Sequence, residues 1–239
     1  MEYGLQLYSV RDLTKDNLDL ALILVAEMGY KFVEFAGFFG HSAEDVKAML
    51  ANYGLSVSGT HSHFADLDND FAATVKYHQT LGNTNYIVPG APWGTAEELT
   101  DTINKFNKYQ PMLASEGITM AYHNHHGEFL PNKDGQIAHT EIEKRTNIDF
   151  EIDTYWAFCA GVDPVETITR LKDRVHVIHL KDGNRDHRGY SLGLGEAPVA
   201  AVREKAIELG MTMVVESEGL EPDGISEVKR CIDYLKTLD

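Results

Sequence analysis

The sequence of 239 residues has few cysteines and no long apolar run, and each shortage excludes a class of protein. Two cysteines are too few for a disulfide framework in a chain of this size. No stretch approaches the ~20 apolar residues that cross a bilayer, and residues 1–12 lack the basic region and apolar run of a signal peptide. We therefore expect a cytoplasmic protein that does not bind a membrane.

Basic residues are also scarce. The sequence has 21 Lys and Arg against 37 Asp and Glu, which gives a formal net charge of −16. This excess of negative charge repels phosphate backbones, so we expect no nucleic-acid partner. A small anionic substrate is still compatible, because one local cation can outweigh the overall field. No compositional break or low-complexity segment divides the chain, and residues 1–239 are expected to form a single domain.

What the sequence does contain is a repeat of short apolar runs, each followed by a segment with helical spacing. Several runs are rich in Val, Ile, Phe and Tyr, as is typical of buried strands. They occupy residues 3–10, 30–37, 55–62, 84–90, 118–125, 147–154, 174–181 and 211–218. The intervening helical segments begin at capping residues such as Ser42 and Thr95 and end at glycines such as Gly54 and Gly210.

Eight strand–helix units in a chain of this length predict parallel strands and a single α/β domain of the (β/α)8 TIM-barrel type. The alternative is an open, doubly wound sheet. That fold would need a glycine-rich phosphate turn after its first strand, where this sequence reads SVRDLTKDN. The barrel is therefore the better prediction.

Polar residues concentrate at the C-terminal ends of the predicted strands, where barrel enzymes carry their catalytic groups. The N-terminal ends show no such concentration, so the asymmetry indicates an active site. The candidates are Glu34, His61, His63, His123, Asn124, His125, Asp153, His179, Lys181, Asp182, Glu216 and Glu218.

Three of these residues, Asp153, His179 and Glu216, are predicted to converge on one divalent metal ion. Imidazole and carboxylate ligands suit Mn, Co, Zn and Fe, and also Mg when more oxygen ligands are present. The alternatives are a helix cap for Asp153, a buried core residue for His179, and Glu218 as ligand in place of Glu216. Lys181 is predicted to reach a substrate oxygen, with an ordinary surface lysine as the alternative.

The segments EIDTYW, HLKDG, LGLGEAPV, VVESE and YHNHHGEF together resemble the xylose-isomerase-like barrels grouped as sugar phosphate isomerases/epimerases. The resemblance extends over essentially the whole chain. Relatives include ketose 3-epimerases, inosose isomerases and dehydratases, 3-dehydroshikimate dehydratase and metal-dependent AP endonucleases. The resemblance implies a metal bound by Glu, Asp, His and Glu, of which the last three correspond to Asp153, His179 and Glu216.

The fourth ligand departs from that pattern, because His123 stands where the epimerases have a glutamate. Residues 123–129 are similar to a subgroup with the pattern HNHxxEF, whose glutamate corresponds to Glu128. The resemblance therefore implies Glu128 as the fourth ligand, with His123 as the main alternative and His125 as a weaker one. If Glu128 binds the metal, His123 is left to act on the substrate. The predicted catalytic residues are His123, Lys181 and Glu216.

The implied function is a divalent-metal-dependent isomerase or epimerase of a sugar or sugar phosphate, which forms the enediolate of a ketose, keto-sugar or inosose. Because His123 replaces a glutamate, epimerisation between two carboxylates is disfavoured. A lyase or dehydratase that acts by β-elimination on a 3-keto-glycoside or inosose is the alternative. An AP-endonuclease-type nuclease is disfavoured by the net charge, and an inactive sugar-binding barrel is disfavoured by the metal-ligand set.

The expected partner is a small-molecule carbohydrate, and a homo-oligomer is left open. For Tyr155 and Trp156, packing in the core is an equal alternative to stacking on a sugar ring. The residues predicted to contact the substrate are Glu34, His61, His63, His125, Tyr155, Trp156 and Glu218.

Overall fold

The computed structural model describes residues 1–239, in which eight parallel strands close into a barrel in the order β1-β10-β7-β6-β5-β4-β3-β2. Each strand pairs with its neighbours along the chain, and the last barrel strand returns to the first. The barrel strands are β1 (Gly4–Gln6), β2 (Phe32–Phe35), β3 (Ser56–His61), β4 (Asn85–Val88), β5 (Thr119–His123), β6 (Asp149–Asp153), β7 (Val175–Leu180) and β10 (Thr212–Val215). The predicted TIM-barrel fold is confirmed.

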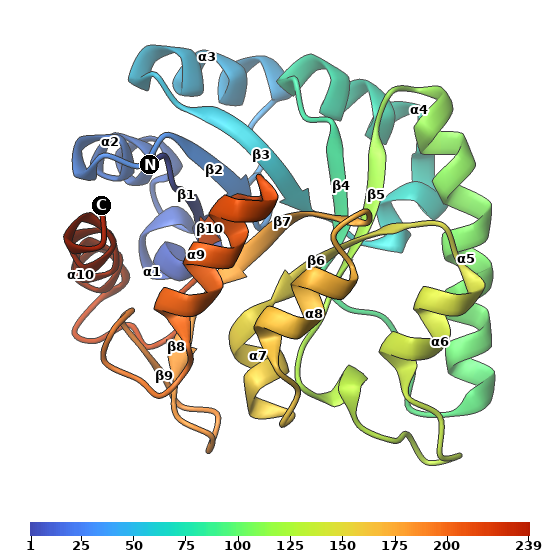
Figure 1. Ribbon diagram of the computed structural model, residues 1–239. Coiled ribbons are helices and arrows are strands. Elements are labelled where there is room, and N and C mark those ends of the chain that lie inside the picture. Colours follow the sequence, from blue (N-terminus) through green and yellow to red (C-terminus); the bar gives the residue numbers. More distant parts are fainter.

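Helices surround the barrel and cover its outer face (Figure 1). The longer ones are α2 (Leu18–Met28), α3 (Ala43–Tyr53), α4 (Phe64–Leu81), α5 (Ala96–Ser115), α6 (Ala138–Arg145), α8 (Pro164–Arg170), α9 (Val199–Leu209) and α10 (Gly224–Thr237). Shorter elements follow several strands. They are η1 (Leu7–Val10), α1 (Arg11–Thr14), η2 (Gly127–Phe129), α7 (Thr154–Cys159) and the short strands β8 (Asp182–Gly183) and β9 (Gly189–Tyr190), which pair antiparallel. None of the helices is long and apolar enough to cross a membrane.

Local sequence explains where these helices begin and end. The hydroxyl of Ser42 accepts a hydrogen bond from the backbone N–H of Asp45, and Thr95 forms a reciprocal capping box with Glu98. Gly54 ends α3 with φ of 66°, a left-handed conformation that side chains disfavour. The first predicted strand is shorter than expected, because residues 7–10 form a 3-10 turn.

The barrel interior is polar toward the C-terminal ends of the strands. Successive side chains on a strand point to opposite faces, so Glu151 and Asp153 share one face of β6 while Ile152 lies on the other. Both carboxylates are fully buried, and Ile152 belongs to the apolar core. The register pairs Asp153 with His179 on the neighbouring strand β7. The strand register thus collects charged side chains inside the barrel.

Two further histidines, His78 on α4 and His139 on α6, are buried outside the strands. Burial lowers the pKa of His78 to about 4 and that of His139 to about 3. An unfolded histidine titrates near pH 6.5, so the unfolded chain takes up protons first as the pH falls. Each neutral histidine therefore contributes stability that is complete above about pH 6.5 and is lost as the pH falls toward its folded pKa.

The unfolding free energy of the protein falls when the pH is lowered from about 7 to about 4.5. We expect this fall to be smaller by roughly 3 kcal/mol in His139→Phe than in the unmodified protein. The imidazole stacks between Phe129 and Phe150, and its Nε2 has no hydrogen-bond partner, so a phenyl ring suits the position. Urea denaturation at the two pH values measures the effect, with the exposed His176→Gln as control. An unchanged pH dependence in His139→Phe would contradict this prediction.

Candidate metal centre

Four buried side chains meet at the C-terminal end of the barrel: His123, Asp153, His179 and Glu216. They come from β5, β6, β7 and the residue after β10, and their ligand atoms all lie within 4.8 Å of one another. Asp153 Oδ2 is 3.6 Å from His123 Nε2 and 3.9 Å from His179 Nδ1. Glu216 Oε2 is 3.3 Å from His179 Nδ1. The structure thus brings the three predicted ligands together, with His123 beside them.

Several of these atoms are buried without a hydrogen-bond partner, namely Asp153 Oδ2 and both ring nitrogens of His123. Buried polar atoms are almost always satisfied in folded proteins, so a group of orphaned ones calls for an explanation. Two imidazoles and two carboxylates are a donor set that divalent transition metals accept readily. The cluster therefore fits a metal ion held by His123, Asp153, His179 and Glu216.

The protonation states of the two histidines differ. Burial, together with the charges of His179 and His61, holds the pKa of His123 well below its ordinary value. His123 is thus neutral at pH 7 and has a nitrogen lone pair available for a metal ion. Burial alone would lower the pKa of His179, but the carboxylates of Glu151 and Glu34 hold it well above its ordinary value.

A second carboxylate–histidine network lies against the other ring nitrogen of His179. Its Nε2 is 2.8 Å from Glu34 Oε1 and 3.3 Å from Glu151 Oε2. His61 Nε2 contacts the same two carboxylates at 3.1 and 2.8 Å, and Gln6 donates to Glu34 at 2.6 Å. Burial would lower the pKa of His61, but the two carboxylates raise it to about 9. These contacts fix the ring of His179 with Nδ1 toward Asp153 and Glu216.

We expect Glu34→Gln to weaken metal binding about 10- to 100-fold at about pH 8.5, because carboxylates behind a ligating histidine orient it and raise its basicity. The loss of this charge also lowers the pKa of His179. A proton then competes less with the metal, so the onset of binding should move to lower pH. Titration calorimetry with Mn²⁺ or Zn²⁺ across pH measures both effects, with exposed Glu44→Gln as control. Unchanged affinity and unchanged pH onset would rule out a positioning role for Glu34.

Lys181 is almost completely buried and neutralises the carboxylates around it. Its Nζ lies 2.8 Å from Glu218, 3.1 Å from Glu216 and 3.7 Å from Asp153. Burial would lower the pKa of Lys181, but the charges of Glu216 and Asp153 raise it above the ordinary value. The ammonium also lies 4.7 Å from the ring centre of Trp156, a cation–π distance. Lys181 is therefore a fixed positive charge beside the cluster and not a surface lysine.

The structure does not bring Glu128 to the cluster. Glu128 is buried in η2, where Oε1 accepts from the hydroxyl of Tyr122 at 3.0 Å and Oε2 accepts from the backbone N–H of His125 at 3.1 Å. Glu128 belongs neither to the cluster of His123, Asp153, His179 and Glu216 nor to a second group of converging ligand atoms, which His61, His123, Glu151 and His179 form. The geometry thus favours the alternative ligand, His123, over Glu128.

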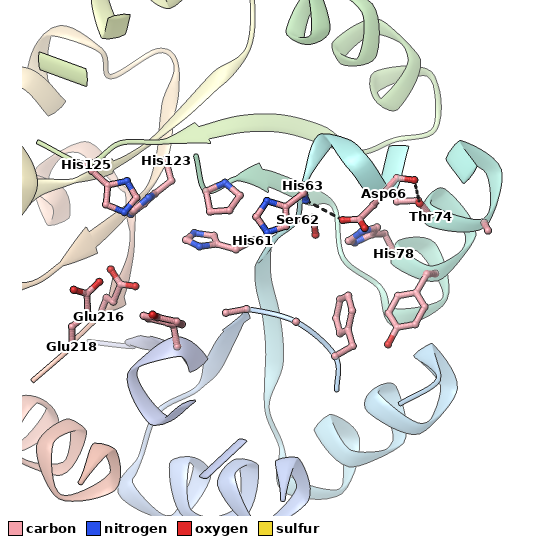
Figure 2. Close-up of a pocket in the computed structure, with 17 residues that line it drawn as sticks. His61, Ser62, His63, Asp66, Thr74, His78, His123, His125, Glu216 and Glu218 are labelled. Carbon is pink, nitrogen blue, oxygen red and sulfur yellow. Dashed lines mark hydrogen bonds between the residues drawn. The ribbon is translucent and has the colours of Figure 1, made fainter. Parts of the chain in front are cut away.

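A cavity of about 780 Å³ opens above the cluster, with His123 and Glu216 in its lining (Figure 2). Four of the residues predicted to contact substrate line it: His61, His63, His125 and Glu218. The other three, Glu34, Tyr155 and Trp156, are not among the 17 lining residues.

The three residues outside the lining have other contacts. Glu34 is fully buried in the network behind His179. The Tyr155 hydroxyl donates to the backbone oxygen of Asn184. Trp156 lies against Lys181, and its buried Nε1 has no hydrogen-bond partner. For Tyr155 and Trp156, these contacts agree with packing in the core and not with stacking on a sugar ring.

Asp182, another strand-end carboxylate, organises the loop with the sequence LGLGEAPV. Its Oδ2 accepts from the backbone N–H groups of Gly193 and Gly195, and its Oδ1 accepts from that of Ala197. A Cβ at Gly195 would lie 2.2 Å from Asp182 Oδ1, so the close approach requires glycine. Asp182 is therefore structural.

Glu151 and Gln6 belong to the site, although neither is predicted from the sequence. Glu151 lies two residues before Asp153, so both side chains point to the same face of the strand. This alternation was the signal available in the sequence. Gln6 had no comparable signal, because a single glutamine in a short strand is unremarkable until its partner Glu34 is located.

Comparison with known proteins agrees with this architecture. The family model described as "Xylose isomerase-like TIM barrel" matches residues 22–238. An inosose dehydratase of Geobacillus kaustophilus is 23% identical over 193 residues, which cover 70% of this chain and 63% of that protein. The chain thus spans less than two thirds of the length of the curated relatives it matches.

Solved structures include a sugar phosphate isomerase/epimerase from Parabacteroides distasonis, with 27% identity, a TM-score of 0.84 and coverage of 98% of this chain and 97% of that one. The IolI protein with a bound zinc atom has a TM-score of 0.76 at 14% identity and covers 100% of this chain and 98% of its own. The family match extends over most of the barrel. The chain belongs to the xylose isomerase-like TIM barrel family.

Proposed function

We propose that the protein is a divalent-metal-dependent enzyme that removes a proton next to the carbonyl of a keto-sugar or keto-cyclitol. The observation that carries the proposal is the cluster of His123, Asp153, His179 and Glu216, of which His123 and Glu216 line the cavity. These four residues would hold the metal, which revises the expectation that Glu128 is the fourth ligand. When bound, a divalent cation polarises the carbonyl and acidifies the adjacent C–H bond.

The acid–base groups for this reaction are proposed to be His125 and Glu218. Both line the cavity above the cluster. His125 follows β5 and Glu218 follows β10, and β6 and β7 separate these two strands in the barrel. A substrate over the cluster would therefore have one group on each side. Lys181, 2.8 Å from Glu218, would stabilise negative charge on that carboxylate.

Return of the proton to the same carbon from the other side gives an epimer, and return to the adjacent carbon gives an isomer. We favour these outcomes because the proposed acid–base groups follow β5 and β10, the strands on either side of β6 and β7. The second candidate is loss of a β-substituent, as in a dehydratase or lyase. It is favoured by the inosose dehydratases among the relatives and by a histidine at position 123 in place of a glutamate.

Incubation with ketoses, inososes and 3-keto-glycosides in deuterated water tests the proposal. Deuterium that enters a recovered ketone or its isomer shows proton abstraction followed by return, whereas release of water or of an aglycone shows elimination. His176→Gln, on the exposed part of β7, is the control for handling and folding. The absence of both deuterium incorporation and product with every ketone, in protein that contains metal, would refute the proposed function.

A further inference from the structure

The cavity extends well beyond the cluster. One end of the cavity, lined by His123, Glu216 and Glu218, contains the proposed reaction site. A second end, the aromatic end, is lined by Phe38, Thr74, Tyr77 and His78 from the segment after β2 and from α4. Figure 2 shows His123, His125, Glu216 and Glu218 on one side, Asp66, Thr74 and His78 on the other, and His61 between them.

The volume exceeds the need of one sugar ring. At the packing density of organic crystals, a monosaccharide occupies on the order of 200 Å³. The cavity measures about 780 Å³, which falls in the range that accommodates larger organic ligands. A single ring over the cluster would leave the aromatic end in contact with water alone.

The aromatic end presents a preformed apolar wall. The rings of Phe38 and Tyr77 pack at 4.4 Å between centroids, and both side chains are half-buried. The hydroxyl of Tyr77 donates to the backbone oxygen of His41 at 2.9 Å, which fixes the orientation of its ring. Phe38 also packs against Phe35 at 5.3 Å. Fixed aromatic faces of this kind favour flat rings and the C–H faces of sugars.

The charges at the aromatic end disfavour an anion, and the cationic His61 in the middle of the cavity is already paired with Glu34 and Glu151. None of the 17 lining residues is Lys or Arg, whereas Asp66, Glu216 and Glu218 are acidic. Thr74 and Asp66 add polar atoms beside the aromatic wall. The Thr74 hydroxyl donates to the Asp66 backbone oxygen at 3.0 Å, which leaves the hydroxyl oxygen able to accept another hydrogen bond. The aromatic end thus suits an uncharged ring that carries some hydroxyl groups or none.

We propose that the aromatic end binds an uncharged ring joined to the reacting sugar, so that the substrate is a neutral glycoside and not a free or phosphorylated monosaccharide. The position of the reacting ring rests on the proposed function. The second ring lies against Phe38 and Tyr77, and its attachment passes His61 in the middle of the cavity.

Binding of four probes to the whole protein tests this inference: methyl β-glucoside, phenyl β-glucoside, cellobiose and glucose 6-phosphate. None is a keto-sugar, so calorimetry and saturation-transfer NMR measure recognition without enolisation. We expect phenyl β-glucoside or cellobiose to bind about two- to tenfold more tightly than methyl β-glucoside, the gain of one ring contact. Preference for only one of them identifies the ring as aryl or sugar. Equal binding of all three glycosides, or tighter binding of glucose 6-phosphate, overturns the proposal.

Substitution at the wall locates the second ring. Phe38→Leu keeps apolar volume but removes the flat aromatic face. It should reduce the preference for phenyl β-glucoside or cellobiose over methyl β-glucoside to less than about twofold. Phe39→Leu is the matched control, because Phe39 is the exposed neighbour and does not line the cavity. A preference that survives Phe38→Leu overturns the assignment of this wall. The probe comparison on the unmodified protein stands whether or not the variant folds.

The two proposals fail in different ways. Deuterium exchange into a free ketose, without any preference for ring-bearing probes, removes the second-ring site and leaves the proposed function. A ring preference that depends on Phe38, without exchange or elimination for any ketone, removes the proposed function and leaves a neutral-glycoside site.

Discussion

Asp153→Asn is expected to abolish catalysis and to weaken metal binding by more than about 100-fold, because even residues behind a ligand contribute 10- to 100-fold. Asp153 Oδ2 is a buried carboxylate oxygen that has no hydrogen bond and lies beside His123 Nε2 and His179 Nδ1. An amide has the same shape but no charge to offer a cation. Oδ1 accepts from the backbone N–H of Trp156, a contact that the Asn side-chain oxygen can keep, so the fold should be retained.

Elemental analysis of protein purified without chelator, followed by calorimetry with added metal, measures the effect of Asp153→Asn. Asp149→Asn is the matched control, since Asp149 lies at the other end of β6 and contacts His176 instead of the cluster. Stoichiometric metal in Asp153→Asn would remove Asp153 from the ligand set and with it the proposed centre.

His123→Gln is expected to lose metal to a similar extent, whereas Glu128→Gln should retain it. His123 is neutral, and neither of its ring nitrogens has a hydrogen-bond partner. The carboxylate of Glu128 is already held by Tyr122 and by the backbone of His125, so its replacement should loosen η2 without emptying the centre. The expected signature of Glu128→Gln is full metal content with altered substrate affinity.

Metal content of the two purified variants, measured side by side, decides between these ligands. The opposite result, with metal lost from Glu128→Gln and kept in His123→Gln, would restore the assignment that the HNHxxEF resemblance implies. Loss from both would mean that the loop moves to bring Glu128 onto the metal together with His123.

Much of the fold follows from local signals in the sequence. The caps at Ser42 and Thr95 and the left-handed glycines at Gly54 and Gly210 are set by nearby residues, so their positions are predictable. The 3-10 turn after β1 is not, because its start depends on the side chain of Gln6, which accepts from the N–H of Tyr8. Short turns are stabilised by such single contacts, and no periodicity reveals them.

The site was predictable where strand geometry alone determines it. Asp153, His179 and Glu216 meet because parallel strands end at the same side of a barrel. The role of Glu34 was not predictable, since whether a strand-end carboxylate faces the cavity or a buried histidine depends on its rotamer and depth. Glu128 lies in a loop, whose path is set by packing against Tyr122 and not by strand alternation.

The Tyr122–Glu128 contact has a consequence for how this barrel diversifies. Tyr122 belongs to the apolar core between strand and helices, on the opposite face of β5 from His123. The segment that carries His125 into the cavity is therefore held by a contact with the apolar core, independently of the residues proposed to bind a cation. If His123, Asp153, His179 and Glu216 hold the metal as proposed, substrate selectivity and metal binding would depend on separable parts of the chain. Exchange of residues 125–137 between homologous barrels, with the tyrosine–glutamate fastening preserved, offers a route to new substrates without redesign of the centre.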